Sequence, residues 1–484
     1  MNSNGHSNGS AEYTVPLQIN GEEVNTEHTF DVVNPATGKV LWKGASASKE
    51  DAMKAVEAAQ AAFPAWSRTK PSKRRDIFLK AADILESRAE ELSQYMVEET
   101  AADQSYASGF NVVNSVEMLK DVAGRIATIV AQVPVMASTE RSAIVYKEPY
   151  GVVLGIAPWN APYILGFRAV VYALAGGNTT VLKGPELSPR SFWAIGSVFK
   201  EAGLPDGCLN VLTYRSQDAA AITTALIEHS AVKKINYTGS TAVGSMVAAI
   251  AGKNLKPVLM ELGGKASAIV LADADLALAA HACALGAFIY AGQVCMSTER
   301  ILVHTSIAAP FRTHLRTAIS QLYSAQAPAP TLVTPAGVSK TKALVSDATS
   351  KGARLLDPAP AGPEPVPTRL RPVVVEGVTK AMDLYYTESF GPSVSLFEFE
   401  EEEEAVRMAN DTEYGLSAAV FTESLATGLR VARGIEAGAV HVNGMTVHDE
   451  PGLPHGGVKR SGWGRFGGVG GGGVFVGKTV TWRD

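Results

Sequence analysis

Residues 150–186 read YGVVLGIAPWNAPYILGFRAVVYALAGGNTTVLKGPE, and this stretch decides the fold class. It holds two short apolar runs, 152–156 and 180–182, each followed by glycine, proline or serine. Between them lies an apolar stretch of helical length, interrupted near its start by Pro158, Asn160 and Pro162. A strand, a helix and a second strand in this order are typical of an α/β protein with a mainly parallel sheet.

The same alternation continues on both sides of that stretch. Apolar runs at 210–212 and 234–237 predict two more strands, each followed by a turn and a helical pattern. A second α/β set runs from 258 to about 440, so the sequence predicts two large units. Towards the N-terminus, residues 48–51 predict a helix start, and an amphipathic pattern over 74–92 predicts a second helix.

Composition excludes several classes of protein. With 46% hydrophobic residues, 19% charged residues and a formal net charge of -5, the chain is typical of a globular enzyme and not of a nucleic-acid-binding protein. Arg168 and two prolines within the most apolar region argue against a membrane span there. The cysteines Cys208, Cys283 and Cys295 have neither disulfide nor metal-ligand spacing, which predicts no metal and favours a reducing compartment. Residues 1–11 predict a disordered tail without a secretory signal, so we expect a cytoplasmic protein.

Two polar clusters follow predicted strand ends and suggest a dinucleotide site. Gly239, Ser240 and Gly244 lie where the strand 234–237 turns into a helix, and a helix N-terminus attracts phosphate. Lys183 and Glu186 follow the strand 180–182, at the sheet edge where α/β proteins bind ligands. A carboxylate there accepts hydrogen bonds from ribose hydroxyls and repels a 2′-phosphate, which favours NAD over NADP, although Lys183 softens the preference. Taken alone, a plain turn and a strand-end ion pair are the commoner explanations.

Three further residues have the chemistry of a covalent mechanism on a carbonyl group. Cys295 follows Gly-Gln-Val and precedes the polar residues 297–299, an unusual setting for a cysteine that only fills the core. Glu261 stands before two glycines, from where a carboxylate can move toward a reacting centre. Asn160 follows a buried strand, where its amide either donates to an oxyanion or caps the turn.

Taken in order, these motifs strongly resemble the aldehyde dehydrogenase family, from about residue 17 to the C-terminus. The resemblance rests on segments in the family's order and near its spacing: Pro158-Trp159-Asn160, Lys183 with Glu186, Gly239-Ser240, Glu261-Leu-Gly-Gly, Gly292-Gln-Val-Cys295, Glu388-Ser-Phe390-Gly-Pro and Gly464-Arg-Phe-Gly. The glycine-rich segment 467–473 and the loop 325–338 depart from the family pattern.

The fold that the resemblance implies has a Rossmann-like cofactor domain, an α/β catalytic domain and a small β oligomerisation element, in a homodimer or homotetramer. On this basis residues 12–130 and 151–257 are expected to form the NAD(P)-binding domain and 258–440 the catalytic domain. Residues 131–150 and 468–484 would form the oligomerisation element. Residues 441–467 would form a substrate-tunnel loop and return to the cofactor domain.

The activity that the resemblance implies is oxidation of an aldehyde to a carboxylic acid through a thioester on Cys295. Asn160 and the Cys295 backbone amide would form the oxyanion hole, and Glu261 would be the base. Lys183 is also expected to be a catalytic residue. The glutamate argues against acyl transfer to coenzyme A, and the intact site argues against a catalytically inactive relative. The cofactor is expected to be NAD, with NADP as the alternative, bound by Ile156, Pro158, Trp159, Lys183, Glu186, Gly239, Ser240, Gly244, Leu262, Glu388 and Phe390.

The substrate expected from the resemblance is an aromatic aldehyde, with an aliphatic aldehyde or a semialdehyde as the alternative. Segments 160–168, 295–300 and 447–450 resemble the salicylaldehyde and vanillin dehydrogenase branch, whose substrates are hydroxylated benzaldehydes. Arg168 has two interpretations: it pairs with Asp449 or Glu450, or it binds a phenolic or carboxylate oxygen of the substrate. The expected substrate contacts are Tyr163, Arg168, Val294, Met296, His448 and His455.

Overall fold

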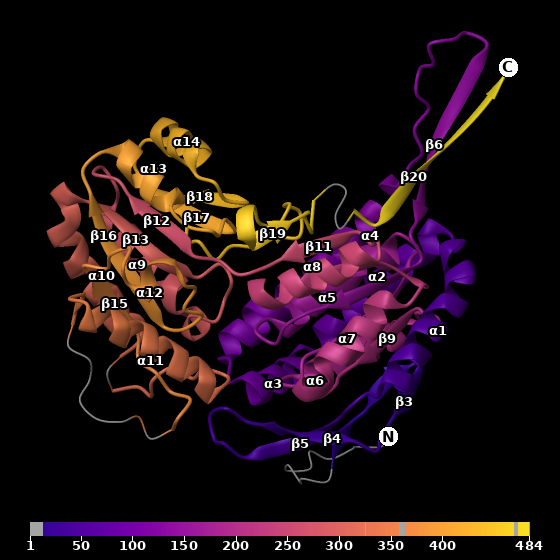
Figure 1. Cartoon of the computed structure of the whole chain (residues 1–484), viewed down its shortest axis with the longest axis horizontal. Coiled ribbons are helices and arrows are strands. Elements are labelled where there is room, and N and C mark those ends of the chain that lie inside the picture. The colour runs from indigo at the N-terminus through magenta and orange to yellow at the C-terminus, as the bar shows by residue number, and fades with distance from the viewer. Residues whose placement is uncertain (1–12, 325, 358–363, 365, 469–472, 484) are drawn as a thin grey trace.

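The computed structural model describes residues 13–324, 326–357, 364, 366–468 and 473–483. The predicted tail 1–11 and residues 469–472 of the glycine-rich segment lie outside the described residues. Two large sheets form two lobes side by side, and a two-stranded arm projects from one of them (Figure 1).

The first lobe is built on an eight-stranded sheet in the order β19-β11-β10-β7-β8-β9-β2-β3. Strands β11, β10, β7, β8 and β9 run parallel, whereas β19, β2 and β3 pair antiparallel at the two edges. The strands are β2 (Leu17–Ile19), β3 (Glu22–Val24), β7 (Val152–Ile156), β8 (Thr179–Lys183), β9 (Leu209–Leu212), β10 (Val232–Thr238), β11 (Val258–Glu261) and β19 (Gly462–Trp463). The four strands predicted from the apolar runs are therefore confirmed, with small shifts at their ends.

Helices cover both faces of this sheet. Because successive side chains of a strand point to opposite faces, Val152 and Leu154 pack with α1, α7 and α8, whereas Val153 packs with α5 and α6. A further layer of α2, α3 and α4 lies on α5 and α6. The helices are α1 (Lys49–Ser67), α2 (Pro71–Ser87), α3 (Ala89–Thr100), α4 (Val113–Arg125), α5 (Pro162–Ala175), α6 (Pro189–Ala202), α7 (Ala219–Glu228) and α8 (Thr241–Lys253), with a π-helix, η1 (Ser105–Val112), before α4.

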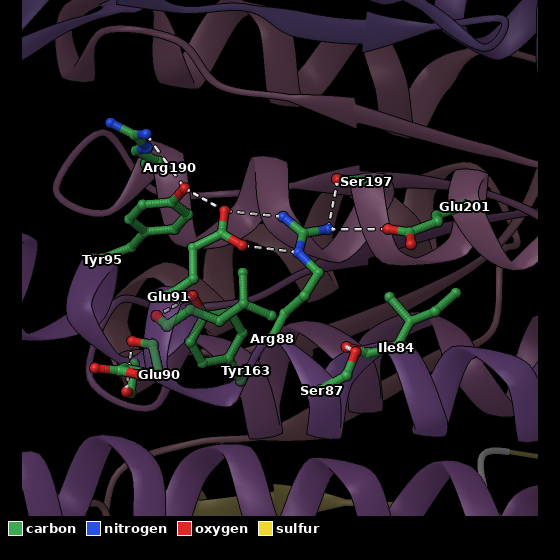
Figure 2. A network of polar contacts seen from close by, with 12 residues as sticks. Ile84, Ser87, Arg88, Glu90, Glu91, Tyr95, Tyr163, Arg190, Ser197 and Glu201 are labelled. Atoms are coloured by element: carbon green, nitrogen blue, oxygen red, sulfur yellow. Dashed lines mark hydrogen bonds and ion pairs between the residues drawn. The ribbon is translucent and has the colours of Figure 1, made fainter. Parts of the chain in front are cut away.

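The outer helical layer differs from the sequence prediction at one place. Ser48 caps α1 as predicted, but the expected single helix over 74–92 is two helices that meet at Arg88. The Arg88 guanidinium contacts side chains of α3 and α6, namely Glu91, Ser197 and Glu201 (Figure 2). The break therefore depends partly on contacts to another helix, and the hydrophobic periodicity of residues 74–92 carries no information about such contacts.

The second lobe is built on a seven-stranded sheet in the order β14-β15-β16-β13-β12-β17-β18, parallel except at the edge strand β14. Helices α9 and α10 cover one face and α11 to α14 the other. The strands are β12 (Ala266–Val270), β13 (Thr298–His304), β14 (Arg354–Leu355), β15 (Val373–Glu376), β16 (Ser393–Phe399), β17 (Ser417–Phe421) and β18 (Ala439–Val442). The helices are α9 (Leu276–Phe288), α10 (Ala308–Leu322), α11 (Pro335–Ser350), α12 (Asp383–Tyr386), α13 (Glu402–Asn410) and α14 (Leu425–Gly434).

The chain passes from the first sheet to the second at residues 262–265. Strand β11 pairs with β10, with Val258 opposite Ile235. The expected domain boundary at 257/258 thus falls one strand before the change of sheet. The strand that carries Glu261 belongs to the first lobe, and the strand that follows Cys295 belongs to the second.

Two small sheets complete the described chain. Strands β1 (Thr14–Val15), β5 (Val40–Ala45) and β4 (Thr29–Val33) form one of them. Strands β6 (Arg141–Pro149) and β20 (Phe475–Arg483) pair antiparallel and form the arm in Figure 1. No helix within the described ranges is long and apolar enough to span a bilayer.

Candidate active site

The candidate site lies where the two lobes meet. Asn160 follows β7 and Glu261 is the last residue of β11, so both lie at the carboxyl ends of strands of the first sheet, with β10 between these two strands. Cys295 lies between a short 3-10 turn, η4 (Ile289–Gly292), and β13 of the second sheet. A loop of residues 443–458, called the return loop below, leads from β18 towards β19 and carries Asp449 and His455.

The turn before Cys295 has a strained backbone. Tyr290, Ala291 and Gly292 have φ values of 48, 55 and 71° in succession. A side chain at Gly292 would collide with the carbonyl of Gly391, so glycine is required there. The Gln293 side chain holds the turn by accepting from the Val333 amide at 2.9 Å. Such strain persists only where the surroundings fix it, and it is common at functional sites.

The nucleophile and the base predicted from the sequence are in contact. The Cys295 thiol donates to Glu261 Oε1, with Sγ 3.3 Å from the oxygen. A side chain at Gly264 would collide with the Cys295 carbonyl oxygen. Gly264 therefore allows the Cys295 turn to approach the end of β11 closely.

The surroundings set the protonation of this pair. Burial raises the pKa of the Cys295 thiol well above its usual range, and the Glu261 carboxylate raises it further. Burial also tends to raise the pKa of Glu261, but His455 and Arg168 outweigh this and bring it to about 2. In this state the site therefore holds a neutral thiol beside an ionised carboxylate.

Arg168 pairs with two carboxylates. Its Nη2 donates to Asp449 Oδ2, and its Nη1 lies 3.5 Å from Glu261 Oε2. His455 Nε2 lies 3.2 Å from Glu261 Oε1, and its Nδ1 lies 3.8 Å from Asp449 Oδ1. Of the two interpretations of Arg168, the pairing with Asp449 is the one that the structure contains; Glu450 instead contacts His448 at 3.1 Å.

Asn160 is buried, and its amide is aimed at the nucleophile turn. Its Nδ2 donates to the Gln293 carbonyl at 3.0 Å. Because a side-chain amide carries two N–H hydrogens, this bond fixes the group and leaves the second hydrogen for another acceptor. The bond crosses from the end of β7 to the turn that precedes Cys295, so it does not cap the turn to which Asn160 itself belongs.

The residues at the strand ends of the first sheet offer the chemistry that a dinucleotide needs. Ser240 caps α8 by accepting from the Val243 amide at 3.4 Å, and the first turn of this helix is open to solvent. A side chain at Gly244 would collide with Leu262, so the glycine lets the helix approach β11. Lys183 Nζ lies 5.0 Å from the Tyr214 ring centroid, and Glu186 accepts from the Ser216 hydroxyl. A helix N-terminus suits a pyrophosphate and a strand-end carboxylate suits ribose hydroxyls, so these residues fit such a cofactor.

A second group of predicted cofactor residues comes from the other lobe. Glu388 accepts from the Gly264 amide at 2.8 Å, and burial followed by the nearby Glu299 raises the Glu388 pKa to about 7. Phe390 has a φ of 53° and meets Trp159 edge to face, with ring centroids 5.9 Å apart. Residues of both lobes thus approach one another beside Cys295.

The remaining predicted residues fall into three groups. Ile156 and Leu262 are buried, Gly239 lies at the end of β10 and Pro158 is half-buried. Val294 and Met296 are buried in the same apolar cluster against which Cys295 packs. His448 is exposed, and the Tyr163 hydroxyl donates to the Leu92 carbonyl at 2.6 Å, so this side chain links α5 to α3.

Two neighbours of the reacting groups escaped the sequence analysis. Thr238 Oγ1 lies 3.4 Å from Glu261 Oε2, and Tyr106 of η1 stacks on Tyr290 with centroids 4.7 Å apart. Burial raises the pKa of Tyr106 well above its usual range, and Tyr290 and Cys295 add to this effect. Thr238 follows a predicted strand directly before Gly239, which could have singled it out; η1 has no comparable signal. No cluster of metal-binding side chains occurs in the part of the chain that the structure describes.

The comparisons with known proteins agree on one family. A sequence model of the aldehyde dehydrogenase family matches residues 22–476. Vanillin dehydrogenase of Pseudomonas fluorescens is 43% identical over 461 residues, which is 94% of each chain. Salicylaldehyde dehydrogenase of Pseudomonas putida is 38% identical over 449 residues, 91% of this chain and 92% of that protein. The crystal structure of a salicylaldehyde dehydrogenase from Pseudomonas putida G7 complexed with salicylaldehyde has a TM-score of 0.93 at 35% identity, covering 97% of this chain and 98% of that one.

The chain therefore belongs to the aldehyde dehydrogenase family, as the motifs predicted, and the α/β fold expected from the resemblance is confirmed. It is an NAD(P)-dependent aldehyde dehydrogenase, an oxidoreductase that acts on the aldehyde group.

Proposed function

We propose that this enzyme oxidises hydroxylated benzaldehydes to their carboxylic acids, with NAD as the preferred cofactor and Cys295 as the nucleophile. The contact of the Cys295 thiol with the ionised Glu261 carboxylate carries the proposal for the chemistry. The similarity to proteins named vanillin and salicylaldehyde dehydrogenases supports the substrate class. Val294 and Met296, which flank Cys295 in the sequence, are buried in the apolar cluster against which it packs, and such surroundings suit an aromatic ring.

The first step is the formation of a carbon–sulfur bond. The thiol proton passes to solvent water, and the thiolate attacks the aldehyde carbon while the carbonyl electron pair moves onto oxygen. The second hydrogen of Asn160 Nδ2 and the Cys295 backbone N–H stabilise this oxyanion. NAD(P)⁺, when bound at the strand ends described above, supplies the hydride acceptor that leaves a thioester on Cys295.

The second step is hydrolysis of the thioester. The ionised Glu261 carboxylate takes a proton from a water molecule that attacks the thioester carbon. The carbon–sulfur bond breaks, and sulfur leaves as the Cys295 thiolate, which regains a proton. Glu261 thus serves as the base of the hydrolysis step, which is the step that Glu261→Gln should slow.

A panel of aldehydes tests the substrate class. NADH absorbance is followed with salicylaldehyde, vanillin, benzaldehyde, acetaldehyde and betaine aldehyde, without coenzyme A or phosphate. We expect the hydroxylated benzaldehydes to have the highest kcat/KM. A higher kcat/KM for acetaldehyde or betaine aldehyde than for every aromatic aldehyde would reject the proposal.

Two substitutions test the assigned roles. Cys295→Ala should abolish oxidation and retain NAD binding, because the thiol forms the covalent intermediate. Glu261→Gln should release a burst of about one NADH per active site and then turn over slowly, since loss of a general base costs about 10²–10⁴-fold. Steady turnover of Glu261→Gln at the parental rate would show that another group is the base.

A further inference from the structure

A closed ring of charged side chains surrounds the Glu261 carboxylate. Oε2 faces Arg168, Arg168 pairs with Asp449, Asp449 faces His455, and His455 faces Oε1. The ring joins helix α5 and the return loop to the end of β11. Its four side chains are almost inaccessible to solvent, with exposed fractions of 0% for Glu261, 4% for Arg168, 8% for Asp449 and 9% for His455.

The two oxygens of Glu261 have different partners. Oε1 is the oxygen 3.3 Å from the Cys295 sulfur and 3.2 Å from His455 Nε2. Oε2 lies 3.5 Å from Arg168 Nη1 and 3.4 Å from Thr238 Oγ1. One oxygen therefore faces the nucleophile while the other is held from behind by a cation and a hydroxyl.

The buried charges of Glu261, Arg168 and Asp449 need one another as partners. A buried carboxylate or guanidinium without a partner is strongly destabilising, and two carboxylates share Arg168 here. The Arg168 guanidinium also lies 5.9 Å from the Phe466 ring centroid, which restricts its position further. Asp449 accepts from Nη2 of Arg168, and this second contact restricts the direction in which Nη1 points.

We propose that Arg168, anchored by Asp449, is the positioning residue that keeps Glu261 ionised and directed at Cys295 for thioester hydrolysis. This inference rests on the proposed role of Glu261 as base. In this proposal Arg168 acts on the reaction through Glu261. It does not bind the phenolic oxygen of a substrate.

The proposal has a consequence for pH dependence. The titratable or charged groups that face Glu261 are Arg168 from α5, His455 from the return loop and Cys295 from the nucleophile turn, with Asp449 behind the first two. Burial raises the Glu261 pKa, and His455 and Arg168 oppose it. Without Arg168 the pKa must rise, so Glu261 becomes protonated at a higher pH and the acidic limb of the hydrolysis rate moves to higher pH.

The test compares Arg168→Met, Arg168→Lys and Asp449→Asn with the parent in rapid-mixing experiments that follow NADH. For Arg168→Met we expect a retained burst of about one NADH per site and a steady-state kcat lowered at least about tenfold, short of the loss for base removal. Asp449→Asn should show the same pattern more weakly. Arg168→Lys keeps the charge without the fork that bridges two carboxylates, so it should restore the position of the acidic limb and part of kcat.

Two control variants separate positioning from general loss of structure. Arg74→Met removes another buried guanidinium, one that lies in α2, and Glu450→Gln changes the exposed carboxylate next to Asp449. Both should keep the parental ratio of burst to steady-state rate and the parental pH profile between about pH 5 and 8, where proteins are generally most stable. Thermal unfolding of each variant identifies those that do not fold, and Asp449→Asn remains informative where Arg168→Met does not fold.

The outcomes distinguish this inference from the proposed function. Loss of the burst together with the steady-state rate in Arg168→Met, or a larger loss for hydroxybenzaldehydes than for benzaldehyde, would assign Arg168 to the substrate and overturn the inference. An unchanged acidic limb in both Arg168→Met and Asp449→Asn would overturn it as well. Parental turnover of Glu261→Gln would instead overturn the proposed function, and with it the inference that depends on Glu261.

Discussion

Cys295 and Glu261 each control the protonation of the other. The thiol hydrogen bonds to the carboxylate at 3.3 Å, and the Cys295 pKa is raised first by burial and then by Glu261. Glu261→Gln removes the negative charge and leaves the burial. We therefore expect the Cys295 thiol of this variant to ionise at a lower pH than in the parent, although still above the usual pKa of a cysteine.

The measurement is the rate of iodoacetamide alkylation of Cys295 against pH, without substrate or cofactor. The midpoint for Glu261→Gln should lie at lower pH than that for the parent. Cys295→Ala gives the background from Cys208 and Cys283, whose pKa values burial raises. An equal or higher midpoint in Glu261→Gln would mean that the carboxylate does not act on the thiol.

Sequence reasoning identified single residues better than their partners. Cys295, Glu261 and Asn160 stand in local settings that carry a chemical signal, and the structure brings the three together. The contact between Arg168 and Asp449 joins residues 281 positions apart, so no local pattern specifies it. Its two alternatives could be formulated from the sequence, but the choice between them required the fold.

At the scale of elements, apolar runs with turn signals predicted the strands of the first sheet well. Strand β7 begins and ends where its run does, since a strand buried on both faces is apolar throughout its length. The division of the helix at Arg88 and the pairing of β11 with β10 could not be predicted in this way. Both depend on contacts with elements far away in the sequence, and a local hydrophobic pattern carries no information about such contacts.

The end of β8 determines the expected cofactor preference. Glu186 is partly exposed there and accepts from the hydroxyl of Ser216, in η3 (Ser216–Asp218). A carboxylate at the ribose edge repels a 2′-phosphate, so the parent should use NAD more efficiently than NADP. Glu186→Gln removes the charge at nearly constant shape and should increase the relative use of NADP.

The ratio of kcat/KM with NAD to kcat/KM with NADP measures this effect. Ser216→Ala is the matched control, because it removes the partner of Glu186 and leaves its charge, so the preference for NAD should persist. Equal or better use of NADP by the parent enzyme would contradict the role given to Glu186.

At the scale of the whole molecule, the arm of β6 and β20 is the feature that a single chain does not explain. It extends away from both lobes in Figure 1 and is anchored at its base, where Asn178 Nδ2 donates to the Val474 carbonyl at 3.1 Å. A two-stranded sheet is at best marginally stable in water. We therefore expect a further chain to cover the arm, which agrees with the homodimer or homotetramer expected from the resemblance.

One face of the arm has the composition of an interface. Alternate residues of a strand lie on the same face, which places Val476, Val480 and Trp482 together with Lys478, and Ile144 joins them because it pairs with Val480. Val476, Val480 and Trp482 are all exposed in the single chain, as a contact surface between subunits requires.

The double substitution Val480→Lys with Trp482→Lys should therefore yield a smaller species in light scattering coupled to size-exclusion chromatography. The charges would have to be buried without partners on association, and that cost opposes assembly. Thr481→Lys places the same charge on the opposite face of the strand and should leave the mass of the parent assembly unchanged. A parent enzyme that elutes as a monomer, or a double variant with the parental mass, would show that this face does not hold the subunits together.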